Sequence, residues 1–164
     1  MRKNTLSILT ALTACTLLFG AAGCSQKKPK ADNEGIVSAL DSSGLGTSDE
    51  GKALGLKTVF FEYDTPLLTP EAKKILKHNS EILKTNPNVK IQIEGNCDER
   101  GGEQYNLALG EKRANSVKLY LQDLGISDNH ITTVSFGKER PLVTGDTEEA
   151  FAKNRRANFA ITAK

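Results

Sequence analysis

The sequence predicts an α/β sandwich of the βαβαβ type, with a mixed sheet of about four strands and helices packed on one face. Short segments of alternating apolar residues, typical of strands, are interspersed with two longer segments of helical periodicity. Turn-forming residues separate these segments, and no internal repeat is present. The folded domain is expected to occupy residues 57–164, which suffices for one hydrophobic core.

The first strand and the first helix are expected at the start of this domain. Residues 58–63 are typical of a strand. Thr69 is the predicted N-cap of a helix, with Pro70 at its first position, and the helix is expected to end before Asn86-Pro87. Its apolar stripe comprises Ile75, Leu76, Ile82 and Leu83.

The second strand and the second helix are predicted from residues 89–95 and 103–123. The strand alternates apolar and polar residues, and Gly125 is placed to end the helix as its C′ residue. The buried face of the helix is expected to consist of Leu107, Ala114, Val117, Leu121 and Leu124.

Three shorter elements complete the predicted fold. Residues 131–136 alternate as a third strand, residues 148–155 favour a short helix, and residues 157–162 alternate as a final strand.

The N-terminus has the pattern of a secretory signal. Arg2 and Lys3 precede a mostly apolar run, residues 6–22, which is too short and too soon interrupted to be a spanning helix. Small residues then lead to Cys24, and this arrangement resembles a bacterial lipobox, in which the cysteine is acylated. We therefore expect residues 1–23 to be a lipoprotein signal peptide. The alternative is an ordinary cleaved signal with an incidental cysteine.

The segment after the signal is expected to be a lipidated N-terminus and flexible linker, residues 24–56. It is rich in Gly, Ser and charged residues and sustains no apolar periodicity. Ser25 follows Cys24 in place of the Asp that resembles an inner-membrane retention signal, which favours the outer membrane. Several acyl chains would hold the protein there firmly, with the domain in the periplasm.

Charge and cysteine usage exclude two classes of protein. The chain has a formal net charge of +2, and Arg2 and Lys3 are the only charged residues before Cys24, so the remainder carries equal numbers of basic and acidic residues. A nucleic-acid binder needs a basic surplus, and we expect no nucleic-acid partner. Cys97 is the only cysteine after Cys24, so no scaffold of internal disulfides is expected.

An acidic loop followed by a helix carries the charges that suggest a ligand. Asp98 follows the second predicted strand, and Arg113 lies fifteen residues later on the second predicted helix. A carboxylate accepts hydrogen bonds from an ammonium group, and a guanidinium grips a carboxylate with two parallel hydrogen bonds. This pair suits a zwitterion such as a free amino-acid end.

Several motifs resemble those of one family. The helix signature Asn106-x-x-Leu109-Gly110-x-x-Arg113-Ala114-x-x-Val117 resembles the OmpA-like C-terminal domain, and the loop 96–101 resembles that of the peptidoglycan-associated lipoproteins within this family. Residues 61–64 and 154–157 match two further segments. Gly102 departs from the family, where a small hydroxyl residue is expected, and Tyr63 replaces a Phe.

The resemblance implies an outer-membrane lipoprotein that binds peptidoglycan non-covalently through the diaminopimelate of its stem peptide. It implies that Asp98 accepts from the ammonium and that Arg113 clamps the carboxylate. Asp64 and Tyr63 would line the pocket wall, and Asn106 would orient the loop or the ligand. The family also suggests a ligand or partner contact for Arg100. Each of these residues also has a structural interpretation, such as a turn, cap, brace or surface charge.

The resemblance also implies partners in the Tol-Pal system of envelope maintenance and cell division. The alternative function is a protein-interaction module whose main ligand is a periplasmic protein such as TolB, together with other Tol components. The sequence offers no separate signature for such a partner.

An enzyme is not expected. A glycosidase pair among Glu94, Asp98 and Glu99 would need one carboxyl held protonated by burial, and Glu94 is expected to face outward. The acidic loop disfavours a nucleophilic pair of Cys97 and His130. No His or Cys cluster has metal-ligand spacing, and we expect no cofactor and no metal.

Overall fold

The sheet has four strands in the order β1-β4-β2-β3. A computed structural model describes residues 45–164; the expected signal peptide, Cys24 and the first part of the expected linker lie outside the described residues. β4 pairs antiparallel with both β1 and β2, whereas β2 and β3 run parallel, so the sheet is mixed as predicted. The strands are β1 (Val59–Phe60), β2 (Lys90–Asn96), β3 (Ile131–Gly137) and β4 (Arg156–Ala163).

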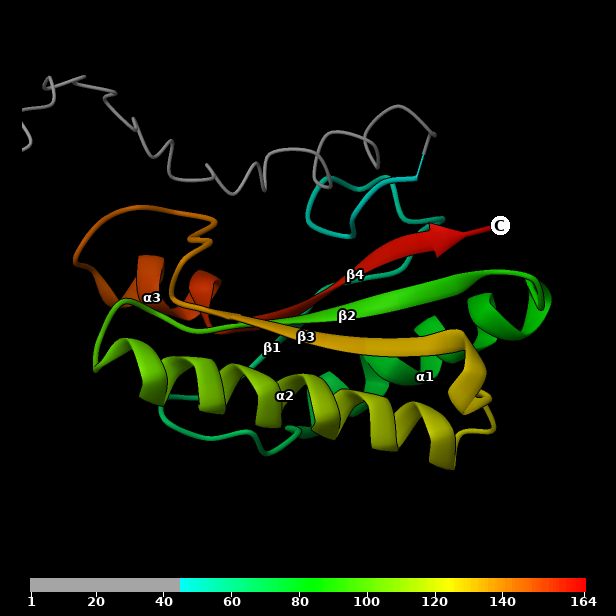
Figure 1. Cartoon of the computed structure of the whole chain (residues 1–164), viewed down its shortest axis with the longest axis horizontal. Coiled ribbons are helices and arrows are strands. Elements are labelled where there is room, and N and C mark those ends of the chain that lie inside the picture. Colours follow the sequence, from blue (N-terminus) through cyan, green and yellow to red (C-terminus); the bar gives the residue numbers. More distant parts are fainter. Residues whose placement is uncertain (1–44) are drawn as a thin grey trace, which may run out of the picture. The chain divides into compact units, whose positions relative to one another are not determined.

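Two long helices cover one face of the sheet, as the sequence predicts. Figure 1 shows α1 (Pro70–Thr85) and α2 (Glu103–Asp123) beneath the strands, while the short α3 (Glu148–Asn154) lies near the end of the sheet that carries the β2–α2 loop. The Thr69 hydroxyl accepts from the Ala72 backbone N–H, which confirms the predicted cap of α1. The core between sheet and helices is led by Leu76, Ile91, Ile93, Val117, Leu121 and Phe159.

The buried face of α2 differs from the predicted one at its first turns. Ala114, Val117 and Leu121 are buried as expected, but Leu107 is 50% exposed, so its assignment to this face was wrong. The helix instead buries Asn106, Leu109, Gly110 and Arg113 in its first half. Asn106 and Arg113 are buried there because their side chains donate to backbone carbonyls at the ends of the strands and in the β2–α2 loop.

The first strand is shorter than expected. Residues 58–63 were predicted to form it, but only Val59 and Phe60 pair with β4. The Phe61 N–H still donates to the Arg155 carbonyl at 2.9 Å. Beyond that point the carbonyl of Glu62 accepts from the Arg113 side chain. A buried guanidinium thus uses this backbone acceptor where the pairing of β1 with β4 has ended.

The folded region begins before residue 57, where the sequence analysis started the domain. Thr47 forms a bridge with Ala160, and the Ser48 N–H donates to the Phe159 carbonyl at 2.8 Å. Ala53 and Leu56 lie in the core at 0% and 3% exposure. Residues 45–56 therefore extend the β1 edge of the sheet along β4. The Gly-rich composition of this segment suggested a linker. Its folding was missed because backbone pairing with a distant strand leaves little trace in the local sequence.

Candidate functional site

The strand directions bring the predicted site residues to one edge of the sheet. β1 and β2 are both antiparallel to β4, so they run in the same direction, and β3 runs parallel to β2. The carboxyl ends of these three strands and the start of β4 therefore meet at one edge. Tyr63 and Asp64 follow β1, Asp98 follows β2, and α2 begins at this same edge.

A small cavity lies at this edge. Five of the six residues predicted to contact a ligand line it, and only Arg100 lies outside the lining. Its volume is about 20 Å³, close to the room that a single water molecule needs. The lining residues are Tyr63, Asp64, Cys97, Asp98, Tyr105, Asn106, Leu109 and Arg113.

Arg113 is the most buried charge of this site, with 1% of its surface exposed. Its Nε donates to the Thr65 carbonyl at 3.1 Å, its Nη1 to the Asn96 carbonyl at 3.0 Å, and its Nη2 to the Glu62 carbonyl at 3.1 Å. Burial lowers the pKa of this guanidinium. Three of its five N–H donors thus tie the strand ends together, and the guanidinium also faces Cys97.

A close contact between α2 and β2 sets the depth of Arg113. A Cβ atom on Gly95 would lie 1.9 Å from the Gly110 carbonyl oxygen, and one on Gly110 would lie 2.3 Å from the Ser135 hydroxyl. Only glycine permits this approach of helix to strand. Arg113 lies one helical turn after Gly110 and therefore reaches the carbonyls at the end of the sheet.

Asp98 is buried between two arginines. Its Oδ2 accepts from Arg100 Nη2 at 2.6 Å and from Arg155 Nη1 at 3.3 Å, and its Oδ1 accepts from the Arg100 backbone N–H at 3.2 Å. Burial alone would raise the pKa of the Asp98 carboxyl. The hydrogen bonds from Arg100 and Arg155 outweigh burial and hold this pKa below its ordinary value. Asp98 is thus a carboxylate at neutral pH.

Arg100 covers Asp98 from the solvent side. Its guanidinium carbon lies 4.2 Å from the centre of the Tyr63 ring and 4.4 Å from that of Phe151. Its Nη1 also approaches Glu148 Oε2 at 3.4 Å. Arg100 therefore joins the β1 end, the β2–α2 loop and α3.

Asn106 braces the loop that carries Asp98. Its side-chain N–H donates to the Arg100 backbone carbonyl at 2.8 Å. The backbone carbonyl of Asn106 accepts from the Cys97 thiol at 3.3 Å. Lys138 donates from outside to the carbonyls of Glu99 and Gly101. Burial raises the pKa of the Cys97 thiol, so this side chain is a neutral filler.

Asp64 adopts a strained backbone conformation at the rim of the cavity. Its φ is +54°, which is uncommon for a residue other than glycine. The Tyr105 hydroxyl donates a hydrogen bond to the Asp64 carboxylate, and this bond raises the pKa of Tyr105. Backbone strain of this kind persists where the surroundings hold it, and it clusters at functional sites.

Four residues of the site were not predicted from the sequence: Tyr105, Glu148, Phe151 and Arg155. Arg155 pairs with Asp98 and, through Nη2, with Glu148 Oε1 at 2.8 Å; Phe151 stacks on Arg100. Arg155 was available as part of the matched Asn-Arg-Arg segment. Glu148 and Phe151 lie on a short helix far along the sequence, and no local pattern links them to Asp98.

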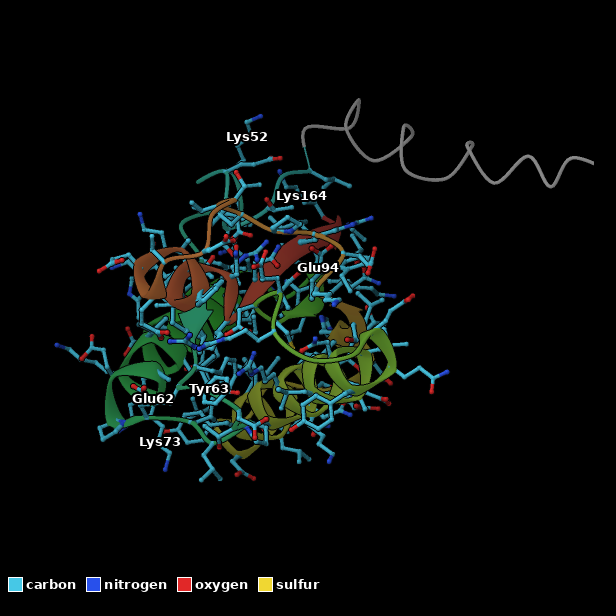
Figure 2. The ribbon with its side chains drawn as sticks, turned by 90° about the vertical axis from the view of Figure 1, so that its left-hand side faces the viewer. Lys52, Glu62, Tyr63, Lys73, Glu94 and Lys164 are labelled. Carbon is cyan, nitrogen blue, oxygen red and sulfur yellow. The ribbon has the colours of Figure 1, made fainter. Side chains whose placement is uncertain are left out.

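Glu94 belongs to a different region from Asp98. It lines a separate cavity of about 280 Å³ beside Gln92 and Arg140, and Figure 2 shows it well apart from Tyr63. Burial raises the pKa of Glu94, against a hydrogen bond from Asn158. Its side chain is thus half-buried and not simply outward-facing as expected. Between residues 45 and 164 no cluster of potential metal ligands is found.

Comparison with known proteins identifies the family. The model of the OmpA family matches residues 60–155, which is more than half of the chain. This chain belongs to the OmpA family. Its matched region contains the whole cavity described above, from Tyr63 to Arg113, and the Asp98 partner Arg155.

Several relatives share the name peptidoglycan-associated lipoprotein. This OmpA-family chain is 42% identical to the one from Pseudomonas putida over 149 residues, covering 85% of this chain and 88% of that protein. It is 38% identical to the one from Haemophilus influenzae over 160 residues, covering 98% and 99%.

Solved structures agree with the fold. The crystal structure of the peptidoglycan-associated lipoprotein from Burkholderia pseudomallei matches with a TM-score of 0.62 at 40% identity, covering 64% of this chain and 89% of that one. The C-terminal domain of Helicobacter pylori MotB matches with a TM-score of 0.63 at 20% identity, over 67% and 87%, which supports the fold alone. No helix within residues 45–164 is long and apolar enough to cross a membrane.

Proposed function

We propose that this protein binds peptidoglycan non-covalently and tethers the outer membrane to the cell wall. The observation that carries the proposal is a buried carboxylate and a buried guanidinium, Asp98 and Arg113, lining one cavity at the ends of two strands. In this proposal the ligand is the diaminopimelate end of the stem peptide. The names of the relatives support peptidoglycan as the polymer.

Each charge of the ligand has a counterpart in the proposed site. In the proposed complex Asp98 accepts from the ammonium, and Arg113 holds the carboxylate. Asp64 and Tyr63 form the wall, and Asn106 holds the loop in place through Arg100. One such site gives modest affinity, and many anchored copies on a continuous polymer turn it into avidity.

The anchor in this proposal is an acylated Cys24, with the folded domain in the periplasm. The lipobox-like pattern and the names of the relatives support it. The proposed role is that of a binding protein, without catalysis.

Co-sedimentation with purified sacculi tests the proposal. The protein used is residues 45–164, because residues 45–56 belong to the folded region. Wild type should pellet with sacculi, and Asp98→Asn should bind at least about tenfold more weakly, since a charge-assisted hydrogen bond contributes roughly 1.5–3 kcal/mol. Wild-type protein that stays in solution would refute wall binding.

Asp123→Asn is the matched control, because it removes an exposed carboxylate at the opposite end of α2. Arg113→Ala is a poor probe of binding. It would leave the three carbonyls of Glu62, Thr65 and Asn96 without their donor and destabilise the fold as well. If Asp98→Asn binds sacculi as strongly as Asp123→Asn, the assignment of Asp98 to the binding site is wrong, while peptidoglycan remains the ligand.

A second candidate function is the docking of a periplasmic protein, with TolB and other Tol components as the expected partners. Exposed aromatic side chains that line the cavity favour it: Tyr63 is 60% exposed and Tyr105 is 55% exposed. If one surface serves both ligands, purified TolB should compete with sacculi for wild-type protein. Independent binding would separate the two surfaces.

A further inference from the structure

The cavity is too small for the ligand proposed for it. About 20 Å³ accommodates one water molecule, whereas an amino-acid end brings an ammonium and a carboxylate on one carbon. Two contacts hold groups that a ligand would need: Tyr105 bonds to Asp64 within the cavity lining, and Arg100, from outside the lining, pairs with Asp98. A ligand that pairs with Asp98 must therefore displace at least one of these groups.

The carboxylate of Asp98 is already neutralised. It accepts three hydrogen bonds, two of them from Arg100 and one from Arg155, out of about four acceptor positions. A ligand ammonium would be a third cation against a single carboxylate, with the buried Arg113 nearby. One of the two paired guanidinium groups has to give up its contact.

Arg155 is fixed in place. Its side chain is 6% exposed, its Nε donates to the Phe61 carbonyl at 3.1 Å, and its Nη2 pairs with Glu148 at 2.8 Å. Moving Arg155 would break contacts to the backbone of the sheet edge and to α3 together.

Arg100 is held more loosely. Its side chain is 35% exposed, its guanidinium donates to no backbone carbonyl, and its buried Nε has no partner among residues 45–164. Besides Asp98, its contacts are the rings of Tyr63 and Phe151 and the exposed carboxylate of Glu148. Neither ring contact depends on the pairing with Asp98, so the guanidinium can leave Asp98 and keep both rings as neighbours.

We propose that Arg100 occupies the ligand's ammonium position on Asp98 and is exchanged for that ammonium when the ligand binds. This inference rests on the proposed function, because the ligand is the amino-acid end proposed there. The released guanidinium stays beside Tyr63 and Phe151, where the ligand's carboxylate, held by Arg113 as proposed above, also offsets the charge of Arg100. One ion pair is thereby replaced by two.

The exchange makes Arg100 a specificity-determining residue. An amine that carries no carboxylate would pair with Asp98 and displace the Arg100 guanidinium. It would offer that guanidinium no carboxylate in exchange. A zwitterion supplies both charges. Arg100 thus opposes simple amines and favours a carbon that carries both groups, as diaminopimelate does and the side chain of lysine does not.

Two short peptides of the same sequence test this, one ending in diaminopimelate and the other in lysine. Binding to the purified full chain in detergent is measured by calorimetry for wild type, Arg100→Gln and Arg140→Gln. Arg140 is the matched control, because its guanidinium is exposed and stacks on Phe136, and it lines the separate Glu94 cavity.

Wild type and Arg140→Gln should prefer the diaminopimelate peptide by about tenfold or more. In Arg100→Gln the lysine peptide should bind about threefold or more tightly than it does to wild type, so that the preference collapses. If the ratio of the affinities for the two peptides is the same in Arg100→Gln as in wild type, the exchange is overturned while the proposed function stays intact. A wild-type chain that binds neither peptide contradicts the proposed function itself.

An NMR measurement separates exchange from a structural role. The Arg100 Nε–H signal of wild type should shift when the diaminopimelate peptide is added, and the pKa of Asp98 in the free protein should rise in Arg100→Gln. A static Arg100 signal on saturation with the peptide overturns the inference.

Discussion

At the scale of single residues, the two charges predicted to bind the ligand differ in how much the fold needs them. Arg113 donates to three backbone carbonyls from two segments, so it joins the end of β1 to the end of β2. Asp98 contacts side chains for the most part and belongs to an ion-pair network that reaches the surface at Glu148. Arg113 is thus part of the framework, whereas Asp98 is a charge whose partner Arg100 can be exchanged.

Acid should remove a stabilising contribution of Asp98. Its pKa in the folded protein lies below the unfolded value of about 4, so the contribution is present above that pH and is lost as pH falls through the folded pKa. Urea unfolding of wild type and Asp98→Asn across this range measures it. The difference in free energy of unfolding between the two should narrow below about pH 4. If this difference in free energy of unfolding stays constant into strong acid, the charged carboxylate of Asp98 does not contribute the stability assigned to it.

At the scale of elements, the contact of α2 with β2 positions the site. Both predicted boundaries of α2 were confirmed, because its N-terminal loop and Gly125 mark them locally; Gly125 has the positive φ of +93° expected of a C′ residue. The rotation of the helix was predicted less well. Leu107 is exposed and Arg113 buried because Gly95 and Gly110 bring the helix close to the sheet there.

A methyl group at Gly110 should push α2 away from the sheet. Its Cβ would meet the Ser135 hydroxyl at 2.3 Å and the Gly95 carbonyl at 2.9 Å, so Gly110→Ala should destabilise the fold by about 1–3 kcal/mol. Urea unfolding measures the loss.

Gly102→Ser is the comparison variant for that measurement. Gly102 is the N-cap of α2 without a side-chain hydrogen bond, and nothing lies near its added Cβ, so the change should stabilise by a few tenths of a kcal/mol. Equal stability of Gly110→Ala and wild type would show that the helix has room to move.

At the scale of the whole described region, residues 45–56 complete the sheet edge that the short β1 leaves open. They place Ala53 and Leu56 in the core, and Asp49 pairs with the buried Arg156 at 2.8 Å. Without them, Phe159 to Ile161 of β4 would lose their backbone partners on the side away from β2. Arg156 would lose the Asp49 carboxylate. This segment is part of the domain in its energetics as well as in its geometry.

Removing this segment should cost stability. A protein of residues 57–164 should unfold with a free energy lower by at least about 3 kcal/mol than one of residues 45–164, because a buried Leu alone contributes roughly 1.5–3 kcal/mol. Chemical denaturation of the two fragments compares them. Asp49→Asn in the longer fragment separates the ion pair from the apolar contacts. Equal stability of the two fragments would contradict this role.

The sequence by itself determined the kinds of element, their order and most of their ends, because periodicity, caps and turns act over a few residues. It also indicated which loop and helix carry the charges of the proposed site. Only the tertiary structure decided that residues 45–56 are folded, that Arg113 is buried on backbone carbonyls, and that Arg155, Glu148 and Phe151 surround Asp98 and Arg100. The physical reason is that these contacts join segments up to about a hundred residues apart, and their free energy depends on burial and on strand directions that no local pattern contains.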